Sequence, residues 1–248
     1  MRAGSSRLPK KYRELLLNNL SLSQFIMSRV RSAAKKLNAT VILSTGNEKD
    51  DYELIEHLDG FYDKVIQTTD INNICLRLSS AIDGNDALVR FWGDCPLFCN
   101  DVLESVVSYL LQGSDFVSSS GPECKFAKGL DLEGYSFKAI SRLNSNLIKD
   151  PRLKEFPSLA LKNDNTICKK NVVSKLNSYN FQLTVDYQSD LDRVKKIVST
   201  LDENTLWELN EAMLFDFAKR GFDLIGEANL NRNVEYSSVA KSLHKQGI

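Results

Sequence analysis

The stretch ALVRFWGDCPLFCNDVLESVVSYLLQ (residues 87–112) contains the pattern from which a fold can be predicted. Its first part, 87–92, is apolar and β-rich, which predicts a buried strand. A glycine turns the chain after that strand, and Asp94 follows at the strand's carboxyl end. The spacing of apolar residues over 100–112 predicts a helix capped by Asn100. The stretch is therefore one strand, one turn and one helix.

The same alternation continues on both sides of this stretch. Further strands are predicted at 39–45, 63–67, 115–120 and in the segment that begins at 179, and further helices at 21–37, 49–59, 70–82, 189–201 and 206–219. Strands that alternate with helices imply crossover connections and parallel pairing. We therefore expect an α/β protein with a Rossmann-like, doubly wound, mostly parallel sheet, in which ligands bind at the carboxyl ends of the strands.

The chain length fits one domain over residues 1–248. Within it, 121–180 has weak periodicity and is interpreted as a substrate lobe or a dimer-interface region, so a homodimer is a possible assembly. Residues 206–248 are interpreted as a C-terminal helical tail.

Composition excludes several classes of protein. Lys+Arg and Asp+Glu both number 32, and this balance argues against a protein that wraps nucleic acid. No apolar run reaches the roughly 18 residues of a membrane span. The five cysteines have no C-x-x-C spacing, which favours free thiols in the cytoplasm over a disulfide framework or a zinc site. With only His57 and His244, a histidine-rich metal site is excluded.

The opening sequence MRAGSSRLPKK (residues 1–11) places small residues between basic ones. Glycine and serine let backbone N–H groups approach an anion, and arginine supplies forked donors. This pattern predicts a loop for a polyphosphate, although it is not a Walker A sequence. Two alternatives remain: a disordered basic terminus, and a transit peptide, since residues 1–47 are rich in Arg, Lys and Ser with Glu14 as their only acid.

Two acids follow predicted strands. Asp94 ends the strand in VRFWGDCPLF, and Asp186 ends the strand in LTVDYQSDLDRV. Carboxylates in this position can hold Mg²⁺ together with phosphate oxygens, and the alternative is that each only caps its own turn. Ser189 is the predicted cap of the following helix, which makes Asp190 and Asp192 acids of its first turn.

These segments resemble a known family. RAGSSRLPKK is similar to the Arg-x-Gly-Ser-Ser-Arg-Leu-Pro-Gly-Lys loop of sugar nucleotidyltransferases, and the branch it resembles most is the cytidylyltransferase-like family of spore coat polysaccharide biosynthesis protein F. RFWGDCPLF resembles that branch's Arg-Ile-Thr-Gly-Asp-Cys-Pro-Leu. KGLDLEGYSF resembles the branch's Asp-Gly-Leu-Asp-Val-Glu and the Ser-Phe that follows it. LTVDYQSDL resembles the branch's Leu-Thr-Val-Asp-Thr-x-Glu-Asp-Leu. CMP-KDO synthetases and acylneuraminate cytidylyltransferases are more distant relatives of the branch.

The resemblance implies a GT-A-like nucleotidyltransferase that transfers CMP from CTP to a sugar, usually an acidic one, for polysaccharide biosynthesis. It implies the following positions: Arg2, Gly4, Ser5, Arg7 and Lys11 at the nucleotide, Asp94 and Asp186 at Mg²⁺, and Asp131 and Glu133 near the sugar. The alternative for the last two is an exposed pair on a strand.

The chain also departs from the family pattern. Lys10 stands where the family usually has glycine, Phe156 replaces a histidine, and Gln67 lies in a segment that has lost an arginine and a glycine. The family's first strand should precede Arg2 and is expected to be missing here. These departures leave two other hypotheses open. One is a nucleotide-sugar-dependent glycosyltransferase. Such enzymes carry an Asp-x-Asp metal motif after a strand, and the DLD at 190–192 matches this motif but lies at the start of a predicted helix. The other is a degenerate homologue without activity.

Overall fold

The computed structural model describes residues 1–5, 7–84, 86–143, 148, 150–162 and 164–225. Strands are β1 (Leu15–Leu17), β2 (Leu20–Ser21), β3 (Ile42–Thr45), β4 (Lys64–Gln67), β5 (Ala87–Arg90), β6 (Phe116–Ser118), β7 (Glu133–Ser136) and β8 (Lys169–Asn171). Helices are α1 (Leu22–Leu37), α2 (Lys49–His57), α3 (Ile74–Ser79), α4 (Asn100–Leu111), α5 (Phe137–Arg142), α6 (Pro157–Lys162), α7 (Gln188–Val198), α8 (Glu203–Trp207) and α9 (Glu211–Lys219). Two short 3₁₀ turns, η1 (Lys11–Arg13) and η2 (Pro151–Lys154), complete the elements.

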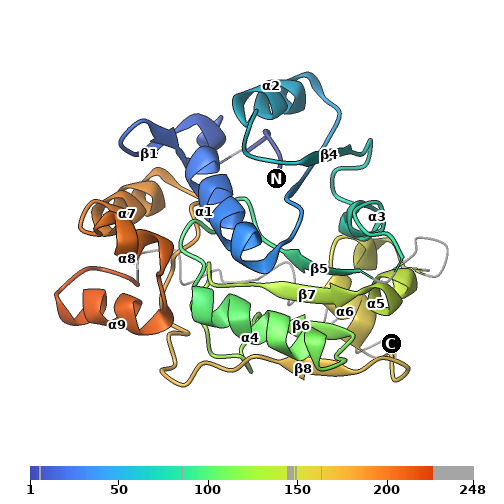
Figure 1. Ribbon diagram of the computed structural model, residues 1–248. Coiled ribbons are helices and arrows are strands. Elements are labelled where there is room, and N and C mark those ends of the chain that lie inside the picture. Colours follow the sequence, from blue (N-terminus) through green and yellow to red (C-terminus); the bar gives the residue numbers. More distant parts are fainter. Residues whose placement is uncertain (6, 85, 144–147, 149, 163, 226–248) are drawn as a thin grey trace.

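The predicted α/β class is confirmed, and the strands are mostly parallel in direction (Figure 1). β3 and β4 pair in parallel, and a second sheet has the order β5-β7-β6-β8. In that sheet β7 pairs antiparallel with both β5 and β6, whereas β6 and β8 pair in parallel. It follows that β5, β6 and β8 share one direction and that β7 alone is reversed. The strands predicted at 39–45, 63–67, 87–92 and 115–120 correspond to β3, β4, β5 and β6.

These two sheets do not pair with each other, and β1 and β2 form a third, antiparallel pair. In the part of the chain that the structure describes, β3 and β5 belong to different sheets, and no strand pairs with both of them. Met1 lies between the carboxyl ends of these two strands: its amine donates to the Ser44 carbonyl at 2.7 Å, and its Cγ is 2.7 Å from the position a Cβ on Gly93 would take. Burial, with Arg77 close by, holds the pKa of this amine well below its ordinary value.

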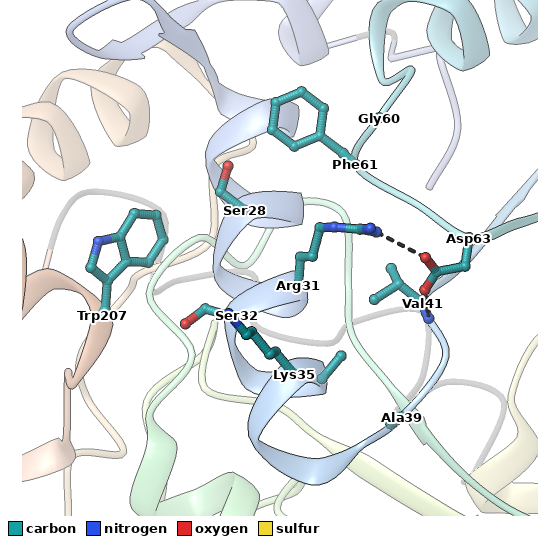
Figure 2. Close-up of a pocket in the computed structure, with 11 residues that line it drawn as sticks. Ser28, Arg31, Ser32, Lys35, Ala39, Val41, Gly60, Phe61, Asp63 and Trp207 are labelled. Carbon is teal, nitrogen blue, oxygen red and sulfur yellow. Dashed lines mark hydrogen bonds and ion pairs between the residues drawn. The ribbon is translucent and has the colours of Figure 1, made fainter.

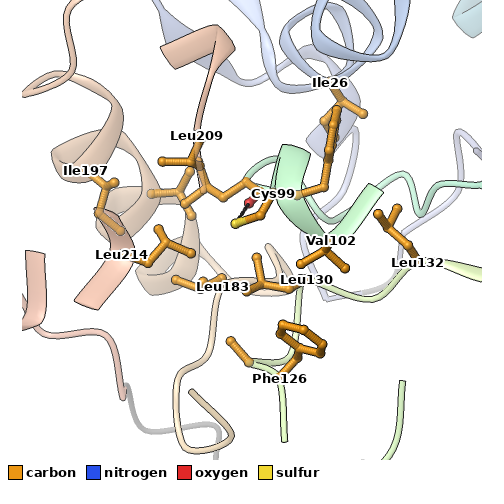
Figure 3. Close-up of a cluster of buried hydrophobic side chains, with 14 of the residues drawn as sticks. Ile26, Cys99, Val102, Phe126, Leu130, Leu132, Leu183, Ile197, Leu209 and Leu214 are labelled. Atoms are coloured by element: carbon orange, nitrogen blue, oxygen red, sulfur yellow. Dashed lines mark hydrogen bonds between the residues drawn. The ribbon is translucent and has the colours of Figure 1, made fainter. Parts of the chain in front are cut away.

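Helix α1 joins the N-terminal segment to the main core. Ser21 and Gln24 form a capping box at its start. Its predicted apolar stripe is confirmed, since Leu22, Phe25 and Ile26 are all at most 2% exposed. They pack with side chains from α4, α7 and the segments 130–132 and 183–185 (Figure 3).

Arg29 is a charged side chain in this core, only 2% exposed. Its Nη1 and Nη2 donate to the carbonyls of Pro96 and Phe98 at 2.7 and 2.8 Å, and its guanidinium lies 4.3 Å from the Phe98 ring centroid. Desolvation lowers the pKa of Arg29 to about 10. Through these contacts α1 fixes the loop that follows Asp94.

Four local predictions are wrong. Asn100 does not cap α4: Cys99 is the N-cap, and the Asn100 amide donates to the Trp207 carbonyl instead. Ser189 does not cap α7, because the helix starts earlier, after the N-cap residue Tyr187. The backbone N–H of Tyr187 donates to Asp190, so a more favourable partner has set the start of the helix.

The third error concerns the strand expected after 179. This segment is extended, but it forms only one isolated bridge, between Gln182 and Lys128. The helix expected at 206–219 is interrupted and becomes α8 and α9.

The irregular stretch 121–180 supplies β7, α5, α6 and β8. α4 packs against β7 so closely that a Cβ on Gly134 would lie 2.8 Å from Val106. The last part of the expected helical tail, 226–248, lies outside the described residues. Among the residues that are described, no helix has the length and apolar character needed to span a bilayer.

Replacing Arg29 by methionine should lower the free energy of unfolding by about 1–3 kcal/mol, because two buried carbonyls lose their donors. The measurement is urea denaturation. The matched control is Arg31→Met on the exposed side of α1, which removes an ion pair with Asp63 and should lower stability by only about 0–1 kcal/mol. Equal losses in the two variants would contradict the role given to Arg29.

Candidate active site

Two acids predicted from separate strands lie side by side. The Val185 N–H donates to the Asp94 carbonyl at 2.9 Å, which places the segment ending in Asp186 next to the loop after β5. Lys11 reaches between the two carboxylates. Its Nζ is 3.8 Å from Asp94 Oδ2 and 3.6 Å from Asp186 Oδ1, and it donates to the Val185 carbonyl at 2.8 Å. Three segments that are distant in sequence therefore meet at one point.

Arg7 reinforces this meeting point. Its Nη2 lies 2.9 Å from Asp186 Oδ1, and its guanidinium lies 5.4 Å from the centroid of the Tyr187 ring. The Arg7 side chain is 52% exposed, whereas Asp186 is only 7% exposed. Arg7 therefore contacts the buried carboxylate while part of its side chain remains open to solvent.

The rest of the opening loop is anchored in several places. The Ser5 hydroxyl accepts from the Leu8 N–H at 3.3 Å, and the Ala3 N–H donates to Asp51 at 3.2 Å. Gly4 is exposed. Arg2 hydrogen-bonds Asn72 at 3.2 Å and so points to a different part of the molecule from Arg7.

Lys10 has a left-handed backbone with φ of 54°. Glycine adopts this conformation without steric strain, whereas a residue with a Cβ is strained there by about 1–2 kcal/mol. This accounts for the glycine that the resembling loops carry at the corresponding position. Lys10 therefore holds a turn that a glycine would form with less strain.

Lys128 was not anticipated from the sequence. Its Nζ lies 3.7 Å from Asp186 Oδ2, the oxygen opposite the one that Arg7 and Lys11 approach. Lys128 opens the segment KGLDLEGYSF, but the resembling sequences have aspartate at this position, so the resemblance gave the lysine no role. Three cations therefore surround one buried carboxylate, and with Asp94 included the five groups carry a net charge of +1.

Gly129 fixes Lys128 in place. Its φ is +107°, and a Cβ there would lie 2.6 Å from the carbonyl carbon of Leu183. The flanking backbone is paired as well: the Lys128 N–H donates to Phe181 and its carbonyl accepts from Leu183. The turn and the extended segment leading to Asp186 are thus in direct backbone contact.

Asp131 and Glu133 differ from each other. Asp131 accepts from the Gly129 N–H at 2.9 Å. Glu133 is buried on β7, where it pairs with Arg90 at 3.0 Å and accepts from the Tyr135 hydroxyl. Burial, followed by the charge of Glu133, raises the pKa of Tyr135 well above its ordinary value. The interpretation of Glu133 as part of an exposed pair is therefore wrong, and its expected role near a sugar stays a prediction.

The donor set fits Mg²⁺ better than a softer metal. Within the described ranges, no group of three or more His, Cys, Asp or Glu side chains surrounds a common point. Asp94 and Asp186 do bracket one cationic group, the Lys11 ammonium, so their oxygens already lie around a positive charge. Mg²⁺ needs only one or two carboxylates when phosphate and water complete its shell. Cys95, whose pKa burial raises well above the ordinary value, stays a thiol and donates weakly to Asp94.

A cavity of about 650 Å³ lies elsewhere, over the outer face of α1 (Figure 2). It is lined by α1, the segments 39–41 and 60–63, and Trp207, and an Arg31–Asp63 ion pair crosses one side of it. Because it contains neither Asp94 nor Asp186, the cavity is not the site formed by the converging strand ends.

The comparisons with solved structures identify the architecture. A cytidylyltransferase from Leptospira borgpetersenii serovar Hardjo-bovis superposes with a TM-score of 0.78 at 22% identity, covering 91% of this chain and 94% of that one. The chain has a nucleotidyltransferase fold.

Two further structures share this fold with lower similarity. CMP:2-keto-3-deoxy-manno-octonic acid synthetase, solved with CTP, gives a TM-score of 0.52 at 17% identity over 81% of this chain and 96% of that one. The 4-diphosphocytidyl-2C-methyl-D-erythritol synthase of Anaerococcus prevotii gives 0.54 at 12% identity over 80% and 95%. No protein-family model and no curated protein sequence matches the chain.

Replacing Gly129 by alanine should separate the turn from the segment that carries Asp186. Gly113→Ala is the matched control, because Gly113 also has a positive φ, +92°, but a Cβ there would meet nothing within 4 Å. Both variants carry backbone strain of about 1–3 kcal/mol, and Gly129→Ala alone adds overpacking of about 1–3 kcal/mol. Thermal melting of the two proteins measures the difference, and identical melting temperatures would show that the contact at Gly129 is not tight.

Proposed function

We propose that the protein is a Mg²⁺-dependent cytidylyltransferase that transfers CMP from CTP to an acidic sugar for the synthesis of a surface glycan. The observation that carries the proposal is the meeting of Asp94, Asp186, Lys11 and Arg7 at one point of a nucleotidyltransferase fold. The ordered resemblance to the spore coat polysaccharide protein F branch supports the choice of cytidine and of a sugar acceptor.

In this proposal the cations bind the triphosphate and the acids bind the metal. Arg7 is about half exposed beside Asp186, so its Nη2 can keep the contact with Asp186 while its other guanidinium donors bind phosphate oxygens. Lys11 would leave the two carboxylates for the phosphates when CTP binds. Asp94 and Asp186 would hold Mg²⁺, which supplies charge neutralisation at the phosphates.

The reaction needs no covalent enzyme intermediate. The acceptor hydroxyl oxygen forms a bond to the α-phosphorus, the bond from that phosphorus to the bridging oxygen breaks, and pyrophosphate leaves. The hydroxyl proton passes to solvent. Catalysis then rests on positioning and on the charges around the phosphates, and this agrees with a site that has ion pairs but no activated nucleophile.

CTP with Mg²⁺ should raise the melting temperature more than ATP, GTP or UTP does. At a hundredfold excess over the dissociation constant, linkage gives about 2.7 kcal/mol of stabilisation. Differential scanning fluorimetry measures the shifts. Equal shifts with every nucleotide would remove the preference for cytidine, and no shift with any of them would favour a homologue without activity. A nucleotide-sugar-dependent glycosyltransferase would instead bind the nucleoside diphosphate sugar and release no pyrophosphate.

Asp94→Asn and Asp186→Asn should each lower pyrophosphate release from CTP and a sugar-acid panel by at least ~100-fold, because each removes a charge from the proposed metal site. Asp59→Asn, at an exposed position on the surface, is the control and should keep full activity. Without ligand, Asp186→Asn should also melt earlier than Asp94→Asn, since three cations would lose their common partner. Near-normal activity in either site variant would make that residue a turn acid.

A further inference from the structure

Lys128 and the opening loop approach Asp186 from opposite sides. Arg7 and Lys11 lie 2.9 and 3.6 Å from Oδ1, while Lys128 lies 3.7 Å from Oδ2. Lys128 comes from a different chain segment. In that segment Gly129 packs directly against the backbone of Leu183. The site thus has cations on both sides of its buried carboxylate, and only one side belongs to the loop.

The ion pair of Lys128 is loose. A charge-assisted hydrogen bond from an ammonium to a carboxylate measures about 2.7–2.9 Å, and 3.7 Å is well beyond that. The Lys128 side chain is 24% exposed, so the protein does not enclose it fully. Arg7 lies 2.9 Å from the other oxygen of Asp186, so this carboxylate has a closer partner than Lys128. Lys128 is therefore free to bind an anion without leaving a buried charge unpaired.

A nucleoside triphosphate has anionic groups on both sides of the bond that breaks. The pyrophosphate part needs cations that hold it as it leaves, and the α-phosphate needs a cation where charge accumulates during attack. Lys11 and Lys128 both lie within 4 Å of the same carboxylate, so one triphosphate can reach both. One carboxylate, Asp186, thus separates two positions of positive charge.

We propose that Lys128 forms a second anion subsite, which binds the α-phosphate of the nucleotide, apart from the pyrophosphate subsite of Arg7 and Lys11. This inference rests on the proposed function. In this arrangement the opening loop binds the pyrophosphate that leaves, and Lys128 binds the α-phosphate of the CMP that is transferred. Removing Lys128 should then weaken binding of the nucleotide but not of free pyrophosphate.

The test is isothermal titration of Lys128→Met, Lys11→Met and the unmodified protein with two probes, CTP and inorganic pyrophosphate, each with Mg²⁺. Lys128→Met should lower CTP affinity about tenfold, as expected for the loss of one charge-assisted contact, and keep pyrophosphate affinity within about twofold. Lys11→Met should weaken both probes. Lys128→Arg should restore CTP binding, because it retains the charge. Lys125→Met, an exposed lysine on the same loop, controls for the change in net charge.

Each other outcome overturns the inference. Unchanged CTP affinity in Lys128→Met removes the subsite, and if the KM of a sugar-acid acceptor rises in that variant, Lys128 serves the acceptor instead. If Lys128→Met lowers the affinities for CTP and for pyrophosphate equally, Lys128 belongs to the same subsite as Arg7 and Lys11. If the unmodified protein does not bind CTP, the proposed function is wrong as well. If the unmodified protein and Lys128→Met both bind CTP normally, only the inference about Lys128 is wrong.

Discussion

The neutralisation of one buried carboxylate, Asp186, organises this molecule. Burying a charge is strongly unfavourable unless partners compensate it, and here Arg7, Lys11 and Lys128 do so from two segments that are more than a hundred residues apart in sequence. The backbone N–H of Asp186 also donates to Asp190 at the start of α7. Because all these contacts are made by one residue, Asp186, the opening loop, the turn at 128–129 and α7 take fixed positions relative to one another.

A second buried charge serves the other half of the site. Arg29 of α1 holds two carbonyls of the loop after Asp94, and α1 follows the opening loop directly in the chain. The N-terminal segment therefore reaches the site in two places: Lys11 lies near both carboxylates, and Arg29 holds the loop that follows Asp94. Both acids are positioned by side chains that precede them in sequence by more than 60 residues.

The parts of this arrangement that follow from local pattern could be predicted. Apolar runs followed by a turn residue marked β3, β5 and β6. The expectation that ligands bind at the carboxyl ends of strands pointed to Asp94 and Asp186, although the segment before Asp186 forms only an isolated bridge. The resemblance to known loops added Arg7 and Lys11. Parts that depend on contacts between distant segments could not be predicted in this way. Lys128 and the burial of Glu133 under Arg90 have no local signature.

The first residues of α4 and α7 are a further case in which contacts in the folded chain overrule a local sequence preference. Asn100 and Ser189 are favourable cap residues, so sequence preference placed the caps on them. In the folded chain the Asn100 amide is drawn to Trp207, more than a hundred residues away, and Asp190 bonds the backbone before Ser189 could cap it. A propensity of about 1 kcal/mol decides a cap only where no tertiary partner competes.

The place of Lys11 between the two acids has a consequence for how the protein exists in the absence of its ligands. Two neighbouring carboxylates would repel each other and favour an open, partly unfolded site until a divalent ion arrived. The lysine acts as an internal counter-ion, so the carboxylates are neutralised from the moment the chain folds. The positive charge between the two acids is thus supplied by the chain itself, and the Lys11 ammonium offsets part of their mutual repulsion in the folded protein.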